Sequence, residues 1–282
     1  MAVRFACALA LTILLAGGPA MAQTKPTIGP TVGETGVEHP HSLIFIGNSF
    51  FYYNNSLHNH VLQLMKSAEP GYKLRGVSVT ISGSGFGWHD VGSYFRPDAI
   101  GTYSFDEHNN VVFNEKTDKP FDLAIMMDCS QCPIHPQLQA NFFDYAKKDS
   151  ATIRAHGAVP VFFMSWAYAD RPEMTAQLAD AYTRAGNDNG ALVIPAGLAF
   201  ARAIRQDPEL ILYAYDRRHP SPAGTYLAAC TVYASLFKAS PVGLGYTAGL
   251  GAHTAKFLQT VAWETVQDYY GAAPVAAARK AE

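Results

Sequence analysis

The residues Ile44-Phe45-Ile46-Gly47-Asn48-Ser49-Phe50-Phe51 join a compact apolar run to a short polar turn. The apolar run stops at Gly47, and Ser49, a small residue with a hydroxyl group, follows two positions later. An apolar run of this length is typical of a buried strand, so Ser49 is expected just beyond a strand end, at the mouth of a sheet. Ser49 is therefore a candidate catalytic nucleophile.

Apolar runs and segments of helical periodicity alternate along the rest of the chain. The predicted strands are 42–46, 77–81, 123–127, 159–164 and 191–194. The predicted helices are 56–68 with Ser56 as its cap, 138–155, 172–185 ending at Gly186, 198–205, 222–237 and 254–269. The strands lack an in–out alternation, which indicates burial on both faces and hence a mainly parallel five-stranded sheet covered by helices. A small hairpin is predicted at Val111 to Phe113, after an Asn-Asn pair.

The first residues have the features of an export signal. Arg4 supplies a positive start, residues 8–15 form a short apolar core, and Ala20-Met21-Ala22 has the small-x-small pattern of a cleavage site. We therefore expect a secreted or periplasmic protein, cut after Ala22. The predicted organisation is a signal peptide at 1–22, a flexible leader at 23–41, one α/β domain at 42–271 and a disordered tail at 272–282.

Composition narrows the classes of partner. The formal net charge is −2, which gives no reason to expect a nucleic-acid partner. The apolar core of the signal is too short to span a bilayer and no later run is longer, so no stable membrane insertion is expected.

Three cysteines remain after the signal, namely Cys129, Cys132 and Cys230. The number is odd, so at least one thiol stays unpaired within the chain. Cys129 and Cys132 have the spacing of a redox motif, which requires its first cysteine at a helix N-terminus. The prolines at 133 and 136 make this stretch loop-like and disfavour a redox role. The sequence leaves open whether the two cysteines are bonded.

A base for Ser49 is found near the end of the chain. Asp216 precedes His219 by three residues in a loop directly before a helix. An aspartate at this spacing can accept a hydrogen bond from one ring nitrogen of the histidine, which leaves the other nitrogen for the serine. Gly83, in a glycine-rich loop after the second strand, suits a backbone oxyanion donor, and the N–H of Ser49 is a second donor.

These segments resemble a known group of enzymes. Gly47-Asn48-Ser49-Phe50 is similar to the first sequence block of the SGNH/GDSL hydrolase superfamily, and residues 216–221 are similar to its last block. Within it, residues 52–55, 164–167 and 226–230 are similar to an exported bacterial branch. The resemblance covers residues 42–237. It implies a flavodoxin-like three-layer α/β/α sandwich and ester hydrolysis through an acyl-enzyme. The expected partner is then a small-molecule or glycan ester, and no cofactor is expected.

The resemblance also implies roles for single residues. Ser49 would be the nucleophile, His219 the base and Asp216 its orienting acid. Gly83 matches the oxyanion glycine of the second block, and Gly85 is a rival for that role.

The third block departs from the superfamily pattern. The superfamily usually has Gly-x-Asn-Asp after its third core strand, where the Asn donates to the oxyanion. Here the strand continues into Asp128-Cys129-Ser130-Gln131, which contains no Asn. Loss of one oxyanion donor costs about 10²–10³ in turnover, so an active enzyme needs a substitute. Ser130 and Gln131 are the candidates.

Further side chains are candidates for the cleft or for a metal. We expect four residues to bind substrate, with a core role as the alternative for either tryptophan: Asn48, Trp88, His89 and Trp166. No metal is expected, because His58 and His60 are two apart on a predicted helix and so do not share a face. His39 and His41 lie in the leader without a further ligand at metal spacing.

The leading hypothesis is an exported serine esterase that hydrolyses small or carbohydrate-borne acyl esters, with acetyl as the first candidate. A lipase or thioesterase of the same fold is the alternative, which exposed apolar residues around Phe50, Phe51 and Phe86 would favour. A non-catalytic carbohydrate-binding protein is a third hypothesis, prompted by the missing Asn. A redox protein based on the cysteine pair is a fourth.

Overall fold

The structure is a computed structural model that describes residues 27–97, 99–100, 103–113 and 119–271. The expected signal peptide, its cleavage site after Ala22 and the expected tail at 272–282 lie outside these residues. Residues 27–41 belong to the expected leader. In this segment Thr27 and Thr31 donate hydrogen bonds to Asp180 and Asn187, which lie on one helix of the domain.

A five-stranded sheet lies at the centre, in the order β2-β1-β5-β6-β7. All of its neighbouring strands are parallel, which confirms the predicted sheet. The strands are β1 (Ser42–Gly47), β2 (Arg75–Thr80), β5 (Leu123–Met126), β6 (Val159–Phe163) and β7 (Leu192–Ile194). Because all five run in one direction, their carboxyl ends meet at one edge, where parallel sheets bind ligands.

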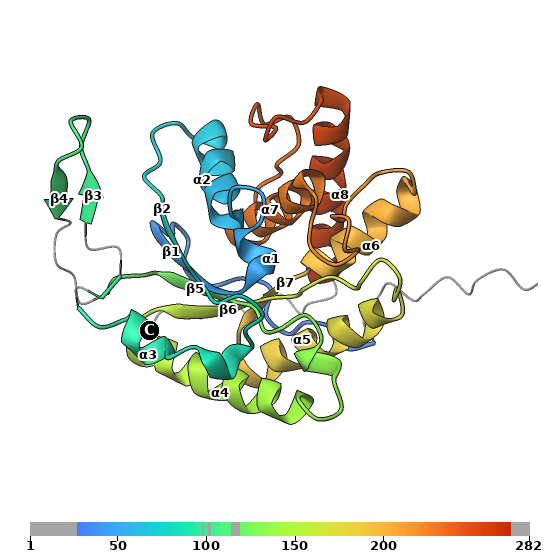
Figure 1. Ribbon diagram of the computed structural model, residues 1–282, viewed down its shortest axis with the longest axis horizontal. Helices are drawn as coiled ribbons and strands as arrows, with labels where there is room; N and C mark the ends of the chain where they lie inside the picture. The colour runs from blue at the N-terminus through green and yellow to red at the C-terminus, as the bar shows by residue number, and fades with distance from the viewer. Residues whose placement is uncertain (1–26, 98, 101–102, 114–118, 272–282) are drawn as a thin grey trace, which may run out of the picture.

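Helices cover both faces of the sheet, so the three-layer α/β/α architecture is also confirmed. Figure 1 shows α2, α6, α7 and α8 on one face and α3, α4 and α5 on the other. The helices are α1 (Ser49–Tyr52), α2 (Leu57–Ala68), α3 (Val91–Tyr94), α4 (Gln139–Ala155), α5 (Met174–Asn189), α6 (Ala196–Gln206), α7 (Pro222–Phe237) and α8 (Ala252–Tyr270). Two 3₁₀ turns are η1 (Phe86–Trp88) and η2 (Cys132–Ile134).

Burial on all sides explains the continuous apolar runs in the sequence of β1 and α7. Leu43 to Ile46 of β1 are at most 1% exposed, as expected for a strand covered on both faces. Helix α7 is buried from Ala223 to Leu236, which is why it is apolar all round rather than amphipathic. Among the helices in the described ranges, none has both the length and the apolar character that crossing a bilayer requires.

Two boundary predictions are wrong in instructive ways. Helix α5 continues through Gly186 to Asn189 and ends at Gly190, whose φ of +56° suits a glycine. A Cβ at Gly186 would collide with Val193, so this glycine allows close helix–strand packing instead of ending the helix. Ser56 does precede α2, but its hydroxyl bonds to Phe51 O and His58 Nδ1 and makes no capping bond.

A second, two-stranded sheet is antiparallel, formed by β3 (Tyr103–Phe105) and β4 (Val111–Phe113). This hairpin, predicted from the Asn-Asn pair, projects from the body of the molecule in Figure 1. It lies away from the sheet edge at which β1 ends, so it takes no part in the site described below.

Candidate active site

Ser49 is held at the end of β1 by its neighbour Asn48. The Asn48 side chain caps α1 by accepting a hydrogen bond from Phe50 N at 3.2 Å. Its amide nitrogen donates to Ser84 O at 3.0 Å and to Asp128 O at 3.2 Å. Asn48 thus ties together the segments that follow β1, β2 and β5. Ser49 is thereby fixed at the first position of a short helix, directly beyond the strand.

Asp216 and His219 lie on a tight loop before α7. Asp216 Oδ1 accepts the backbone N–H groups of Arg218 and His219, each at 3.0 Å. Ala214 N donates to His219 O at 2.8 Å, which closes the loop. Trp166 Nε1, from the segment after β6, donates to Arg218 O at 2.9 Å. These bonds fix the loop internally and against the end of β6.

The structure brings the three predicted side chains into one hydrogen-bonded chain. His219 Nε2 lies 2.7 Å from Ser49 Oγ, and His219 Nδ1 is hydrogen-bonded to Asp216 Oδ2. Desolvation opposes ionisation of Asp216, but the hydrogen bonds from the His219 ring and the two backbone N–H groups outweigh it. They hold the Asp216 pKa below its ordinary value. A carboxylate in this position can stabilise a proton that moves from the serine to the imidazole.

The His219 ring is also packed between aromatic side chains. Tyr53, at the end of α1, stacks on one face of the imidazole, and the Phe50 ring meets it edge-on. The sequence motifs alone give Tyr53 no role in the site. Tyr53 follows Ser49 by four residues, and that short spacing on a turn of helix is the one signal that could have found it.

A pocket of about 430 Å³ opens beside Ser49 and His219. Gly83, Ser130 and Gln131, the three predicted oxyanion residues besides Ser49, all contribute to its wall. The complete lining is Asn48, Ser49, Phe50, Gly83, Cys129, Ser130, Gln131, His135, Leu138, Tyr168, Arg218 and His219. Residues from the ends of β1, β2, β5 and β6 therefore meet at one edge of the sheet, as the parallel topology requires.

The two candidate oxyanion glycines occupy different surroundings. Gly83 lines the pocket beside Ser49 and has a φ of +71°, a conformation that favours glycine. Gly85 instead lines an adjoining pocket of about 330 Å³. A Cβ at Gly85 would come within 2.5 Å of Asp128 Oδ1, so that glycine makes room for a buried carboxyl group. Of the two glycines, Gly83 is the one that lines the pocket containing Ser49.

The segment after β5 forms part of the pocket wall. Cys129 and Cys132 form a disulfide, and Cys230 is free and buried. Ser130 Oγ is hydrogen-bonded to Tyr168 OH at 2.6 Å. Within the described residues the Gln131 side chain has no hydrogen-bond partner, which leaves its amide available to a ligand.

Asp128 fixes this segment through hydrogen bonds to the backbone. Its Oδ1 accepts the backbone N–H groups of Phe86 and Cys129, each at 2.8 Å. Burial raises the pKa of Asp128 to about 6, although the two N–H groups lower it in part. Asp128 therefore joins the loop after β5 to the glycine-rich loop after β2.

The four side chains expected to bind substrate are not all in the pocket. Asn48 lines it but is 4% exposed, with its amide already bonded to protein. Trp88 is 66% exposed and lines the adjoining pocket. Neither pocket is lined by His89 or Trp166.

Both of these residues support the site from inside. His89 is buried and bonds to Ser84 Oγ and Tyr94 OH, each at 3.0 Å. Trp166 is 1% exposed and stacks between Phe50 and Phe200, so the core alternative describes it.

Among the described residues, the histidine pairs are not part of the group whose ligand atoms are close enough to hold a metal ion. His60 bonds to Tyr246 OH at 2.8 Å and to Asn54 O at 2.7 Å, so both of its ring nitrogens are used within the protein. In the described ranges, the side chains spaced to hold a metal ion are those of Asp128, Cys129 and Cys132. The two sulfur atoms of that group are in the disulfide, whereas a cysteine binds a metal as a thiolate.

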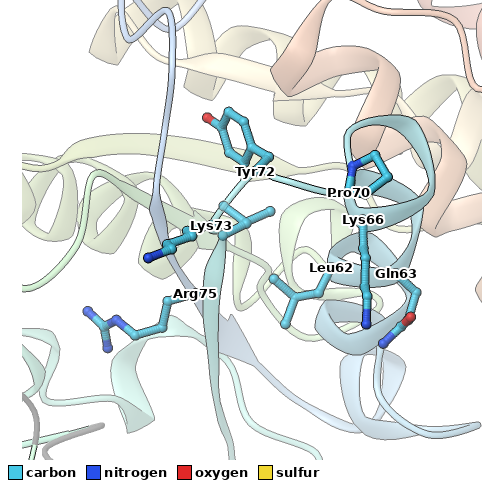
Figure 2. A pocket seen from close by; sticks show the side chains of 8 residues that line it. Leu62, Gln63, Lys66, Pro70, Tyr72, Lys73 and Arg75 are labelled. Atoms are coloured by element: carbon cyan, nitrogen blue, oxygen red, sulfur yellow. The ribbon is translucent and has the colours of Figure 1, made fainter.

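A further pocket, of about 460 Å³, lies at the opposite edge of the sheet. Figure 2 shows its lining, which includes Leu62 and Lys66 from α2 and Arg75 from the start of β2. Arg75 pairs with Ser42 at the beginning of β1, whereas Ser49 follows the end of β1. The length of the strands therefore separates this pocket from Ser49 and His219.

Comparisons with known proteins agree with this architecture. No protein-family model and no curated protein matches the sequence. The chain is similar in structure to a DUF4886 family protein from Bacteroides uniformis, with a TM-score of 0.56 and 19% identity over 80% of this chain and 94% of that one. It is also similar to a candidate SGNH hydrolase from Slackia heliotrinireducens, with a TM-score of 0.51 and 22% identity over 69% of this chain and 97% of that one. At these identities the likeness is one of fold, and the expected SGNH hydrolase fold is confirmed.

Proposed function

We propose that this chain is a serine esterase, which hydrolyses carboxylic esters through an acyl-enzyme on Ser49. The observation that carries the proposal is the hydrogen-bonded chain from Ser49 Oγ through His219 to Asp216, at the wall of an open pocket. The SGNH hydrolase fold supports the same assignment as an analogy.

In the first half of the reaction, Ser49 Oγ attacks the ester carbonyl carbon while His219 Nε2 accepts the hydroxyl proton. The imidazolium that forms is stabilised by the Asp216 carboxylate on its other nitrogen. The tetrahedral intermediate then collapses, the bond to the alcohol oxygen breaks, and His219 returns the proton to the leaving alcohol. The acyl group remains on Ser49.

Charge on the tetrahedral oxygen requires donors that are already in place. The backbone N–H groups of Ser49 and Gly83 are the first two donors that we propose. Among the described residues, neither group donates a hydrogen bond to protein. The Gln131 amide is the third donor that we propose, in place of the Asn that the superfamily usually carries. Its free amide and its position in the pocket wall support this role.

In the second half, water replaces the alcohol. His219 removes a proton from a water molecule, which attacks the acyl carbon and releases the acid from Ser49. The regenerated Ser49 hydroxyl then returns to its hydrogen bond with Nε2. No step in this scheme uses a metal or a cofactor.

The proposed substrates are small or carbohydrate-borne acyl esters, with acetyl esters first. The main pocket adjoins a second one, and the two share Gly83, Cys129 and Leu138 in their linings. The exposed indole of Trp88 in the second pocket is a surface on which a sugar ring can stack, which supports a carbohydrate-borne ester. We further propose that the protein is exported, which the disulfide supports because disulfides persist in oxidising compartments.

The alternatives from the sequence receive less support. A lipase would be favoured by exposed apolar residues around Phe50, Phe51 and Phe86, but these rings are all at most 5% exposed. A carbohydrate-binding protein has no need for a serine, a histidine and an aspartate in proton-transfer geometry.

The test is release of nitrophenol from nitrophenyl acetate by the wild type and by Ser49→Ala. We expect the variant to lose several orders of magnitude in kcat, on the order of 10⁴–10⁶ as when a triad serine is removed. Ser240→Ala is the matched control, because Ser240 is exposed and does not line the pocket. A fluorophosphonate should label Ser49 in the wild type. Equal rates in wild type and Ser49→Ala would contradict the proposal.

A further inference from the structure

Arg218 is held in a defined position beside the proposed nucleophile. It lines the pocket directly before His219 in the sequence. Its backbone N–H donates to Asp216 Oδ1, and its carbonyl accepts from Trp166 Nε1. Its guanidinium carbon lies 4.7 Å from the centre of the Tyr168 ring. Both the backbone and the side chain of Arg218 are therefore oriented by neighbours.

The stacking partner is itself fixed. Tyr168 is 7% exposed, and its hydroxyl bonds to Ser130 Oγ at 2.6 Å. A cation stacked on an aromatic ring is attracted to the ring face without losing its charge. The Tyr168 ring thus orients the guanidinium and leaves its N–H donors, which lie in the plane of the group, free to bind a ligand.

The charge of Arg218 is not balanced within the pocket. Among the described residues that line it, Arg218 is the only Lys or Arg, and none is an Asp or Glu. The nearby Asp216 carboxylate is already bonded to His219. Other arginines of the chain, namely Arg171, Arg184 and Arg202, each pair with a carboxylate, whereas Arg218 has none within ion-pair distance in the described ranges. A cationic group therefore faces the space next to Ser49 without a counter-ion from the protein.

A guanidinium presents its donors in a planar fork that matches a carboxylate, and such pairs are stronger than neutral hydrogen bonds. We infer that the ester hydrolysed at this site carries a carboxylate group, and that Arg218 binds this group. The inference rests on the proposed function and gives it a substrate class. The carboxylate can belong to the acyl part, as in a half-ester of a dicarboxylic acid, or to the alcohol part, as in an acylated uronic acid.

The test compares pairs of esters that differ in one carboxylate. Mono(4-nitrophenyl) glutarate and 4-nitrophenyl valerate test the acyl side, with the spontaneous rate in buffer subtracted. Acetylated glucuronic acid and acetylated glucose test the alcohol side through release of acetate. The ratio of kcat/KM within each pair measures the preference for a carboxylate, and the pair that shows it identifies the part of the ester that carries the charge.

The variants are Arg218→Gln, Arg218→Lys and Arg217→Gln. We expect the wild type to prefer the charged ester of one pair by about tenfold or more, the effect of one charge-assisted hydrogen bond. Arg218→Gln should lose this preference, because its KM for the charged ester rises far more than its KM for the neutral ester. A melting temperature equal to that of the wild type would show that the variant is folded. Arg218→Lys should retain part of it. Arg217→Gln is the control, because Arg217 is exposed and does not line the pocket.

Each outcome separates this inference from the proposed function. If Ser49-dependent hydrolysis occurs but neither pair shows a preference, or Arg218→Gln keeps the preference, the inference is overturned and the esterase stands. If none of the four esters is hydrolysed in a Ser49-dependent manner, the proposed function is overturned and the inference with it. If Arg218→Gln does not fold, the preference of the wild type and its reduction in Arg218→Lys decide the question.

Discussion

Tyr53 stacks on the imidazole of His219, with ring centroids 4.2 Å apart and planes inclined by 10°. The Phe50 ring meets the same imidazole at 5.4 Å and 75°. Asp216 fixes one ring nitrogen, and these two aromatic rings limit the rotation that remains. We therefore assign Tyr53 a positioning role, since it acts on His219 and not on the reacting atoms.

Replacing Tyr53 by Leu should lower kcat by about two- to tenfold, because an aromatic pair of this kind is worth about 0.5–1.5 kcal/mol. Tyr53→Phe keeps the stack and should keep kcat. Steady-state kinetics on nitrophenyl acetate measure both variants, and KM should change little in either. Equal losses in Tyr53→Leu and Tyr53→Phe would show that the hydroxyl, and not the stack, is what matters.

The two glycines of the loop after β2 make a matched pair for the oxyanion assignment. A Cβ at Gly83 meets no atom within 4 Å, but its φ of +71° is strained for alanine. We expect Gly83→Ala to shift the donor and lower kcat by about 10²–10³, the loss found on removing one oxyanion donor. Gly85→Ala places a Cβ against Asp128 Oδ1, so it should lower the melting temperature.

Kinetics and thermal unfolding of both variants separate the two effects. A large loss of kcat with unchanged melting temperature in Gly85→Ala would transfer the oxyanion role to Gly85.

The sequence predicts which residues meet at the carboxyl ends of the strands, but it does not predict the direction in which each side chain points. The apolar runs and their parallel direction require that the residues after β1, β2 and β5 meet at one edge, which is why Ser49, Gly83 and Ser130 line one pocket. Their separation along the chain carries no information about side-chain direction. Trp166 follows β6 as expected, yet it turns inward and stacks on Phe50.

The role of a glycine at a helix end also depends on tertiary packing, which the sequence pattern does not show. The sequence pattern predicts a helix end at Gly186 and not at Gly190, because it does not reveal that Val193 packs against Gly186. The disulfide is a similar case. The spacing of Cys129 and Cys132 fits a bonded pair or a free one, and the turn at residues 129–132 decides between them.

Reduction of this disulfide should impair the proposed activity. Ser130 and Gln131 lie between the two cysteines and form one wall of the pocket, so the bond restricts the loop that presents them. Treatment with a phosphine reductant should lower kcat on nitrophenyl acetate, and Cys129→Ser with Cys132→Ser should reproduce the loss without reductant. The double variant should be insensitive to reductant, and mass spectrometry counts the thiols. Unchanged kcat after full reduction would show that Ser130 and Gln131 need no such restraint.

A buried carboxyl group on α4 should make the stability of the protein depend on pH. Asp149 is 3% exposed, and among the described residues its Oδ2 has no hydrogen-bond partner. Burial raises its pKa to about 7, with Lys148 lowering it and Asp128 raising it. In the unfolded chain an aspartate has its ordinary pKa of about 3.9. The folded state therefore favours the protonated form, and this stabilisation is present below about pH 4 and is lost as the pH rises through 7.

The melting temperature of the wild type should accordingly fall between pH 5 and pH 8. The side chain of Asp149→Asn cannot ionise, so the melting temperature of this variant should fall less over the same pH range. The loss of unfolding free energy between pH 5 and pH 8 should be smaller in the variant than in the wild type by on the order of 1–3 kcal/mol. The pKa of Asp128 is also raised, to about 6, so Asp128 likewise destabilises the protein as the pH rises. The Asp149→Asn variant should therefore keep part of the pH dependence of stability. Asp144→Asn is the control, because Asp144 is exposed on the same helix. Identical pH profiles for wild type and Asp149→Asn would mean that Asp149 is not protonated in the folded protein at pH 5.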